Sequence, residues 1–400
     1  MKKKVVLAFS GGLDTSYCVK YLAEDIGFEV HTAVVNTGGF DKEELEQIAH
    51  SAQSLGVSSH KSIEATQKYY QECVRYLIFG NVLKNNTYPL SVSAERVFQA
   101  LEIIEYAKTI GADAVAHGST GAGNDQVRFD LVFQVLAPDL EIITPIRDQQ
   151  LSREQEVAYL KEKGVEKDWS KAKYSINKGL WGTSVGGAET LTSNGVLPDE
   201  AFPTKLRVKD NERESLKLHF EKGELVGIDG KMMPAVEAII ALEKIAGNFA
   251  VGRDVHVGDT IIGIKGRVGF EAAAPLIIIK AHHLLEKHVL TKWQQHWKEQ
   301  LGNWYGMMLH EAAFLDPVMR NIETFLEETQ RTVTGEVQVK LYPYRFEITG
   351  IESKYDLMSA KFGSYGEMNL AWSGEDVKGF TKILGNQIRI YHQVNGSKND

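Results

Sequence analysis

The sequence contains too few cysteines for disulfide or zinc chemistry. Its 400 residues include only Cys18 and Cys73, which cannot build a disulfide framework or a zinc site with four thiolates. Such sparse cysteine usage is typical of proteins of the reducing cytosol. The apolar stretch over residues 5–9 follows three lysines but is shorter than the about 7 to 15 residues of an export signal. We therefore expect a cytoplasmic location.

Long apolar runs and an excess of positive charge are also missing. The longest apolar candidate, residues 276–279, ends at Lys280, far short of the about 18 to 20 residues that span a membrane. The 53 acidic and 45 basic side chains give a formal net charge of −8, which argues against a general nucleic-acid binder. We expect neither a membrane nor a nucleic acid as a partner. The length predicts two or three domains, because single cores rarely exceed about 250 to 300 residues.

The first part of the chain alternates short apolar runs with helical periodicity, which is typical of β-α units around a parallel sheet. Capping boxes that begin at Asp41 and Ser152 predict helices from about residues 42 and 153. Strands are predicted over residues 5–9, 29–35, 112–117 and 141–144. The expected fold class is therefore α/β, with a parallel-sheet domain over residues 1–168.

Residues 169–203 lose this periodicity and are rich in Gly, Ser, Thr and Asn, which indicates a linker or binding loops near a domain boundary. Farther on, the patterns predict strands near residues 216–228 and 336–349, and helices near 234–246, 275–290 and 306–330. We expect a mixed α+β second domain over residues 169–372. An amphipathic stretch at 374–384 predicts a C-terminal helical arm, residues 373–400, which packs on its own domain or on a neighbouring subunit.

A glycine loop follows the first predicted strand. It reads Ser10-Gly11-Gly12-Leu13-Asp14-Thr15-Ser16 and leads into a periodic helix. At the carboxyl end of a parallel strand, paired glycines let the backbone approach a ligand, and the helix offers unpaired amides to an anion. Neither a Walker ending nor a Gly-x-Gly-x-x-Gly pattern is present, which excludes the commonest phosphate loops. The loop resembles the Ser-Gly-Gly-x-Asp-Ser loop of ATP pyrophosphatases, which adenylylate a substrate and release pyrophosphate.

A second glycine loop, HGSTGAGNDQVRF over residues 117–129, follows another predicted strand. Two such loops at strand ends of one sheet imply a shared cleft. Together they resemble the argininosuccinate synthase family, whose patterns are close to Ala-x-Ser-Gly-Gly-Leu-Asp-Thr-Ser and His-Gly-x-Thr-Gly-x-Gly-Asn-Asp-Gln-x-Arg-Phe. The likeness runs, less tightly, along most of the chain.

The resemblance implies an AMP-forming carbon–nitrogen ligase of arginine biosynthesis. In that family the ureido oxygen of citrulline attacks the α-phosphate of ATP, pyrophosphate leaves, and the aspartate amine then displaces AMP from the citrullyl-adenylate. The resemblance also implies an adenine nucleotide alpha hydrolase-like first domain, a synthetase and multimerisation second domain, and a homotetramer that exchanges its C-terminal helices. ATP is the expected co-substrate and Mg²⁺ the expected metal, with Asp14 as a candidate support and no ligand set readable from the sequence.

The resemblance also assigns residues to each ligand by position. Phosphoryl chemistry of this kind needs positioning and charge neutralisation more than a covalent nucleophile. The expected catalytic residues are Asp14, Asp125 and Arg128. The expected ATP site comprises Ala8, Ser10, Gly11, Gly12, Asp14, Thr15, Ser16, Val35 and Gly118. The expected aspartate site comprises Thr120, Asn124 and Asp125, and the expected citrulline site comprises Tyr88, Ser93, Asn124, Arg128, Ser175 and Ser184.

Departures from the family pattern surround the expected citrulline site. The usual Leu-Gly-Thr-Ser reads LSVS at 90–93, the usual Ser-x-Asp-x-Asn-Leu reads SINKGL at 175–180, and the usual Ser-x-Glu ends at Gly186. The family's later Glu and Tyr align with Gly258 and Phe270. Because carboxylates are lost and Lys178 appears, one hypothesis is a citrulline acylated on its α-nitrogen, with a succinyl or an acetyl group. The extra carboxylate of a succinyl group would lie near Lys178. The alternative is drift, or a one-residue slip that puts Asp259 in place of the Glu.

Rival functions remain from two other classes. A tRNA thiolase or a glutamine-dependent amidating ligase would need a reactive cysteine, which two scattered thiols do not supply. A non-catalytic nucleotide sensor would bind ATP without turnover. Pyrophosphate release that requires aspartate and a citrulline separates the enzyme from the sensor.

Overall fold

A computed structural model describes residues 2–169, 173–359, 366 and 371–396. Residues 170–172 of the predicted linker, and most of 360–372 at the predicted arm boundary, lie outside the described residues. Contacts divide the chain into two compact units, Met1–Tyr355 and Asp356–Asp400. No helix in the described part of the chain is both long and apolar enough to cross a membrane.

A five-stranded parallel sheet forms the first part of the larger unit. Its strands are β1 (Lys4–Ala8), β2 (Glu29–Asn36), β3 (Ser59–Glu64), β4 (Ala114–Ala116) and β5 (Glu141–Ile143). They lie in the order β3-β2-β1-β4-β5, and all neighbours are parallel. The predicted α/β class and the predicted strands are confirmed. The sequence did not predict β3, because this edge strand is mostly polar and pairs only with β2.

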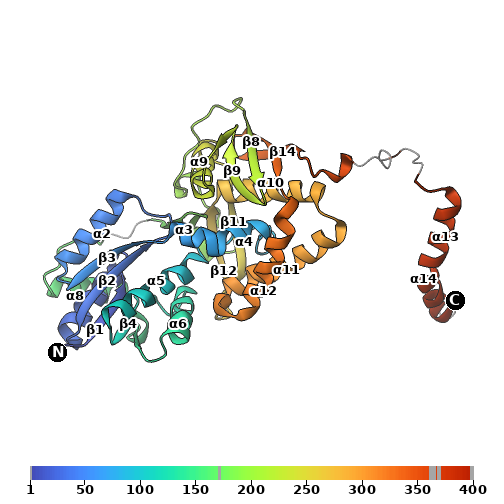
Figure 1. Ribbon diagram of the computed structural model, residues 1–400. Coiled ribbons are helices and arrows are strands. Elements are labelled where there is room, and N and C mark those ends of the chain that lie inside the picture. The colour runs from blue at the N-terminus through green and yellow to red at the C-terminus, as the bar shows by residue number, and fades with distance from the viewer. Residues whose placement is uncertain (1, 170–172, 360–365, 367–370, 397–400) are drawn as a thin grey trace. The chain divides into compact units, whose positions relative to one another are not determined.

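Alternate residues of the strands enter two cores on opposite faces of this sheet. Val5 and Leu7 of β1 belong to one core, whereas Val6 belongs to the other. Figure 1 shows helices covering both faces. On the Val5 side lie α1 (Leu13–Lys20), α2 (Lys42–Ser54) and α8 (Arg153–Glu162), and on the Val6 side lie α5 (Glu95–Ile110) and α6 (Asp125–Leu136). The capping boxes predicted at Asp41 and Ser152 are confirmed at the starts of α2 and α8.

The order of the strands predicts where a ligand-binding crevice lies on the parallel sheet. The chain runs outward from β1 through β2 to β3 and then returns to β4 on the other side of β1. At such a reversal, the loops after the two central strands diverge and leave a crevice at the carboxyl edge of the sheet. The loops that follow β1 and β4 are the two glycine loops.

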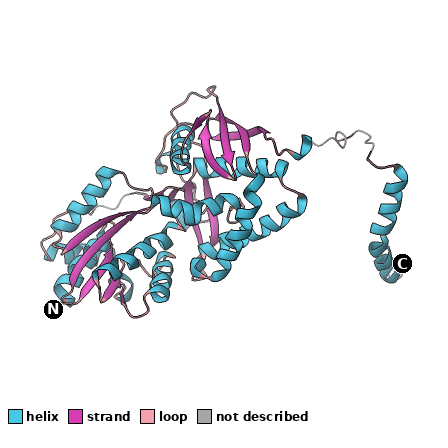
Figure 2. Ribbon diagram, in the orientation of Figure 1, coloured by secondary structure: helices cyan, strands magenta, loops and turns pink. Residues whose placement is uncertain are grey.

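Two antiparallel sheets make up the rest of the larger unit (Figure 2). The five-stranded sheet has the order β10-β9-β8-β13-β14. Its strands are β8 (Glu214–Glu221), β9 (Glu224–Ile228), β10 (Lys231–Met232), β13 (Gly335–Tyr342) and β14 (Arg345–Glu352). The four-stranded sheet has the order β11-β12-β7-β6 and consists of β6 (Ser175–Gly179), β7 (Gly182–Gly186), β11 (Arg253–Asp259) and β12 (Lys265–Glu271).

The prediction of a structureless linker or loops at 169–203 was wrong for β6 and β7. These strands are short and rich in Gly and Ser, so they carry no apolar alternation of their own. They are stabilised by pairing with each other and by the pairing of β7 with β12, which is distant in sequence. Tertiary contacts thus decide the conformation that the local sequence leaves open.

Helices pack around these sheets. They include α9 (Ala235–Gly247), α10 (Ala273–Val289), α11 (Lys292–His310) and α12 (Pro317–Thr329). The short helix α4 (Arg75–Phe79) packs against α10, α11 and α12. Two more short helices, α3 (Thr66–Tyr69) and α7 (Pro145–Asp148), belong to the first part of the chain. The prediction of one helix at 306–330 was wrong, because α11 ends at His310. Ala312 is in the left-handed region with φ 65°, and Asp316 caps a new helix that has Pro317 in its first turn.

The described residues of the smaller unit include the α-helices α13 (Gly374–Leu384) and α14 (Asn386–Asn395). Ser373 caps α13 through a capping box with Asp376. The amphipathic stretch predicted at 374–384 is therefore confirmed as a helix. Its apolar residues, among them Phe380 and Leu384, are exposed within the chain.

Candidate active site

The first glycine loop turns the chain from β1 into α1. Gly11 has φ +77°, a left-handed conformation that favours glycine. Gly12 begins the helix without a side-chain cap, so the first amides of α1 remain free for an anion. The Ser16 hydroxyl donates to the Gly12 carbonyl at 2.7 Å, and the Thr15 hydroxyl donates to the same oxygen at 3.3 Å. The loop therefore has the backbone geometry of a phosphate site.

The second glycine loop lies against the first. A Cβ added to Gly118 would lie 3.3 Å from Cγ2 of Thr15 and 3.4 Å from Cβ of Asp14. These distances are tighter than most real Cβ contacts, so the two loops approach each other as closely as a glycine allows. The contact brings the carboxyl ends of β1 and β4 to one wall of the crevice.

Hydrogen bonds fix the shape of the second loop. His117 Nδ1 accepts from the Ser119 amide at 3.2 Å, so its Nε2 carries the proton that bonds Asp130 at 2.9 Å. The Gln126 amide donates to the carbonyls of Gly121 and Gly123 at 2.6 and 3.1 Å. A glycine loop held at both ends in this way is preorganised for binding.

A cavity of about 940 Å³ opens between the two loops and β6. Ten of the residues that the resemblance assigned to ligands line it: Ala8, Ser10, Gly12, Asp14, Thr15, Val35, Gly118, Thr120, Asp125 and Ser175. Gly11 and Ser16 belong to the first loop, and Asn124 lies beside Asp125, but these three do not line the cavity. The sequence analysis missed Arg96, Gln99 and Arg153, which also line it. No short motif marks these three residues, which come from α5 and α8 rather than from the loops.

Asp125 joins two guanidinium groups at the start of α6. It accepts from Nε of Arg96 at 3.0 Å and from Nη1 of Arg128 at 3.1 Å. Burial by itself would raise the pKa of Asp125, but the two guanidinium groups outweigh it and lower the pKa. Arg96 also donates to the Asn177 side chain at 3.2 Å, where the family pattern has a carboxylate. Asp125 is thus a fixed anion between two cations.

The other residues assigned to citrulline are buried beside this cluster. Tyr88, Ser93, Arg128 and Ser184 are each at most 6% exposed, and none of them lines the large cavity. The Tyr88 ring stacks on His256 at 5.0 Å and tilts against Phe270 at 5.3 Å. Ser184 pairs with Phe270 across β7 and β12. The structure therefore brings Arg128 to Asp125 and gathers Tyr88, Ser184 and Phe270 around the four-stranded sheet.

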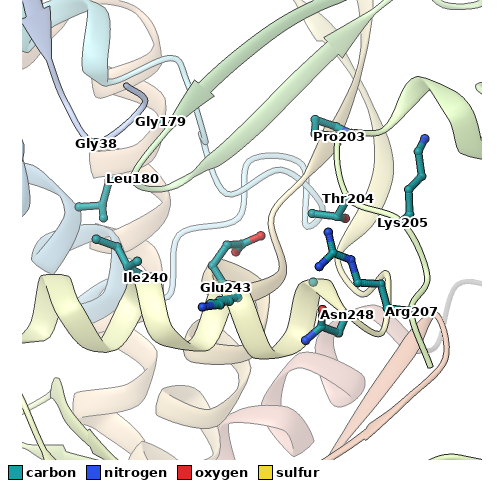
Figure 3. Close-up of a pocket in the computed structure, with 12 residues that line it drawn as sticks. Gly38, Gly179, Leu180, Pro203, Thr204, Lys205, Arg207, Ile240, Glu243 and Asn248 are labelled. Atoms are coloured by element: carbon teal, nitrogen blue, oxygen red, sulfur yellow. The ribbon is translucent and has the colours of Figure 1, made fainter. Parts of the chain in front are cut away.

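A second, smaller cavity of about 380 Å³ lies between α9 and the loop that carries Thr204 and Arg207 (Figure 3). Burial raises the pKa of Glu243 in its wall to about 7. The Glu243 carboxylate accepts from the Ala274 amide at 2.8 Å and so caps the start of α10. The assigned residues do not line this cavity, and Glu243 has a structural role there.

Glu156 on α8 lies behind the first glycine loop and is only 3% exposed. Burial, together with the Asp14 carboxylate, raises the pKa of Glu156 to about 8. A glutamate in an unfolded chain has a pKa of about 4.3, so the folded protein holds a proton that the unfolded chain has lost. The stabilising effect of this proton is complete below the unfolded pKa and is lost as the pH rises through about 8.

We therefore expect the Glu156→Gln variant to lose part of the alkaline destabilisation. Because glutamine stays neutral, we expect the melting temperature of the variant at about pH 9 to exceed that of the unmodified protein by several degrees. This difference in melting temperature decreases towards about pH 5, where Glu156 is protonated in the folded protein. Thermal unfolding of both proteins across this range measures the effect. A constant difference at every pH would contradict the assignment.

Both cysteines are fully buried, and burial raises the pKa of each thiol well above its usual value. Neither thiol is an accessible nucleophile. The described residues contain no group of three or more His, Cys, Asp and Glu side chains that could hold a metal ion. Thiolation and glutamine-dependent amidation therefore have no chemical support in the described structure.

Both parts of the chain match family models. The model described as the arginosuccinate synthase N-terminal HUP domain matches residues 4–166, and that of the arginosuccinate synthase C-terminal domain matches residues 174–391. The argininosuccinate synthase of Methanocaldococcus jannaschii is 37% identical over 392 residues, which is 98% of each chain. That of Dictyoglomus thermophilum is 37% identical over 401 residues and the full length of both, and that of Pyrococcus furiosus is 34% identical over 98% of this chain and 95% of its own.

These relatives are enzymes, and they match the chain from one end to the other. The two glycine loops that suggested the family from sequence are the same loops that meet at the strand reversal. The chain therefore belongs to the argininosuccinate synthase family, whose members ligate citrulline and aspartate with ATP in arginine biosynthesis.

Proposed function

We propose that the cavity between the two glycine loops is where this chain carries out an adenylation followed by a ligation. The observation that carries the proposal is the contact of Gly118 with Asp14 and Thr15, which joins two anion-binding loops over one cavity. In the first step the ureido oxygen of a citrulline bonds to the α-phosphorus of ATP, and the bond to pyrophosphate breaks. In the second step the aspartate amine bonds to the ureido carbon, and the bond from this carbon to the oxygen that leaves with AMP breaks. The nitrogen releases its surplus protons to solvent and keeps one N–H in the guanidinium product.

The residues of the first loop bind the phosphates in this proposal. The free amides of α1 and the hydroxyls of Ser10 and Thr15 offset the charge that develops on the phosphoryl oxygens. Val35 and Ala8 provide an apolar wall for the nucleotide. Such preorganised donors accelerate the reaction without forming a covalent intermediate with the enzyme.

The residues of the second loop and of α6 hold the amino acids. Thr120, Asn124 and Asp125 bind aspartate, and Arg128 holds Asp125 in place while facing the citrulline residues. Tyr88, Ser93, Ser175 and Ser184 are assigned to citrulline. Buried charge pairs fix orientation well, because neither partner can move without leaving the other unpaired.

Mg²⁺ fits this site as an ion that binds together with ATP, not as an ion held by the protein alone. Mg²⁺ is commonly held by substrate phosphates with one or two carboxylates. Asp14 lines the cavity within the first loop and is the carboxylate that would meet a metal bound to ATP. When bound, the ion would neutralise phosphate charge.

The test is to identify the products of the full-length protein with ATP labelled at the α- or γ-phosphate. Over many turnovers we expect AMP and pyrophosphate in equal amounts, and sustained release of both only when aspartate and a citrulline are both present. Citrulline, N-acetylcitrulline and N-succinylcitrulline are each supplied. ADP in place of AMP, or ATP binding without turnover on every co-substrate, would contradict the proposal, and the second result would favour a nucleotide sensor.

We further propose a cytoplasmic homotetramer with domains at 1–168 and 169–372 and an exchanged arm at 373–400. The exposed apolar residues of α13, among them Val377, Phe380 and Leu384, support the arm as an interface between subunits.

A further inference from the structure

The aligned position of the missing family glutamate lies on the inner face of β11. His256 and Gly258 are buried on this strand, whereas Val257 and Asp259 between and after them are exposed. Successive side chains of a strand point to opposite faces, so Asp259 points away from the face that Gly258 occupies. The Asp259 carboxylate is also bound to Lys265 at 2.6 Å. Asp259 therefore does not replace the missing glutamate.

The space for a carboxylate at position 258 is taken by other groups. A Cβ added to Gly258 would lie 2.7 Å from Nε2 of His256 and 3.4 Å from Nδ2 of Asn85. The Asn85 amide is itself fixed by donating to the Val257 carbonyl at 3.0 Å. An imidazole and an amide nitrogen therefore surround the place that a carboxylate side chain would need.

Two buried nitrogen atoms near this place have no hydrogen-bond partner. They are Nδ1 of His256 and Nε of Arg128, on side chains that are 6% and 4% exposed. Tyr88 stacks on His256 at 5.0 Å and, like Arg128, is among the residues assigned to citrulline. Buried polar atoms almost always have a partner in a functional protein, and Nε of Arg128 can only donate. The Arg128 atom therefore points to a ligand that accepts hydrogen bonds, and Nδ1 of His256 can either donate to this ligand or accept from it.

The charges around this place favour an anion. Lys84 is the chain neighbour of Asn85, which lies beside Gly258, and the backbone of Lys84 pairs with that of Tyr88. Its charge acts on His256, Asp259 and His310. Two carboxylates near Lys84 and Arg128 are already neutralised, Asp259 by Lys265 and Asp125 by two arginines. Glu311 is 41% exposed and contacts His310, whose pKa is lowered to about 4 by burial, so this imidazole is neutral. A free ammonium would find no buried unpaired carboxylate among these three.

We propose that the citrulline used by this chain is acylated on its α-nitrogen and that the acyl group ends in a carboxylate. The inference rests on the proposed function, since the ureido group still attacks ATP and no bond of the acyl group forms or breaks. Acylation replaces a cation by a neutral amide whose carbonyl accepts hydrogen bonds, and the added carboxylate pairs with Lys84. The product is the matching N-acylated argininosuccinate.

Lys178, the lysine that the sequence analysis favoured, is less suitable than Lys84 as the partner of the added carboxylate. Lys178 lines the large cavity together with Ser175 and Asn177. Side chains alternate along a strand, so its side chain leaves β6 on the face opposite to theirs, and no contact joins it to Gly258 or His256 in the described structure. Asn177 is the member of this strand that bonds Arg96 of the site. The added carboxylate is therefore assigned to Lys84.

Steady-state kinetics with the full-length protein, ATP and aspartate test the proposal with citrulline, N-acetylcitrulline and N-succinylcitrulline. We expect kcat/KM for N-succinylcitrulline to exceed that for citrulline at least about 100-fold, the usual effect of a buried charge without a partner. Equal or better turnover of citrulline would overturn the proposal while leaving the proposed ligation intact. Absence of pyrophosphate with all three compounds would instead overturn the ligation itself.

The Lys84→Met variant tests the terminal carboxylate. We expect it to lower the preference for N-succinylcitrulline over N-acetylcitrulline about tenfold, because a charge-assisted contact is lost. Lys340→Met, on the exposed face of β13 in the other antiparallel sheet, is the matched control and keeps the ratio. An unchanged ratio in the Lys84 variant, or equal efficiency of the two acyl compounds in the unmodified protein, would overturn the assignment of the carboxylate.

A double variant, His256→Ala with Gly258→Glu, tests the same pocket in the opposite direction. Removing the imidazole makes room for the new side chain, and the added carboxylate pairs with an ammonium. We expect the ratio of citrulline to N-succinylcitrulline efficiency to rise at least about tenfold. A folded double variant with an unchanged ratio would count against the proposal.

Discussion

Replacing Asp125 by asparagine is expected to lower kcat/KM by at least about 1,000-fold. Asp125 is the shared partner of Arg96 and Arg128, and Arg128 is 4% exposed. Without the carboxylate, the buried Arg128 loses its ion pair and Arg96 keeps, among the described carboxylates, only Glu95 at 3.4 Å. An unpaired buried charge costs about 3 to 5 kcal/mol. The geometry that holds both amino acids would be lost together with this charge.

The loss of Asp125 can be separated from simple unfolding. Because the first glycine loop does not depend on Asp125, we expect ATP still to bind, as measured by calorimetry, within about threefold of the unmodified affinity. Asp139→Asn, at an exposed position just after α6, is the matched control and keeps full activity. An Asp125 variant that retains even about a tenth of the activity would mean that the bridge is dispensable.

The second large effect is expected from Gly118→Val. The first atom of any side chain at Gly118 already lies 3.3 to 3.4 Å from the first loop, and the two methyl groups of valine extend farther. The two loops would have to separate, which removes the phosphate amides from their positions over the cavity. We expect KM for ATP to rise about 100-fold, with a further fall in kcat, because small displacements of positioning groups are costly in phosphoryl transfer.

Gly121→Val in the same loop provides the matched comparison. Its Cβ would meet nothing closer than Cγ of Arg147 at 3.7 Å, an ordinary contact. We expect KM for ATP to change less than about threefold in this variant. Similar kinetics for the two valine variants would show that contact between the loops is not what aligns the nucleotide.

The parallel sheet and its loops were predictable because their signals are local. The apolar run of β1, the glycines that follow it and the capping boxes of α2 and α8 each lie within a few neighbouring residues. The same holds for the second loop, where closely spaced Gly, Asn, Asp and Arg residues already indicated a ligand. For these parts, sequence pattern and tertiary structure agree.

The walls of the site that form from distant segments could not be predicted in this way. Arg96 meets Asp125 across 29 residues, and Asn85 meets Val257 across 172. β6 and β7 depend on β12 for pairing, and their own composition favours loops. That His256 and Gly258 share the buried face of β11 followed only from the structure of this strand.

The parallel sheet and the α+β part of the larger unit share one hydrophobic core, which restricts movement of one part relative to the other. This core includes Val6 of β1, Trp181 beside β7, Phe270 of β12 and Ile277 of α10. Apolar packing is therefore continuous from the parallel sheet into the α+β part. Swinging one part against the other as a rigid body would open this core to water. Substrates are therefore expected to enter and products to leave through local rearrangement of the loops at the rim, while the framework beneath keeps its form.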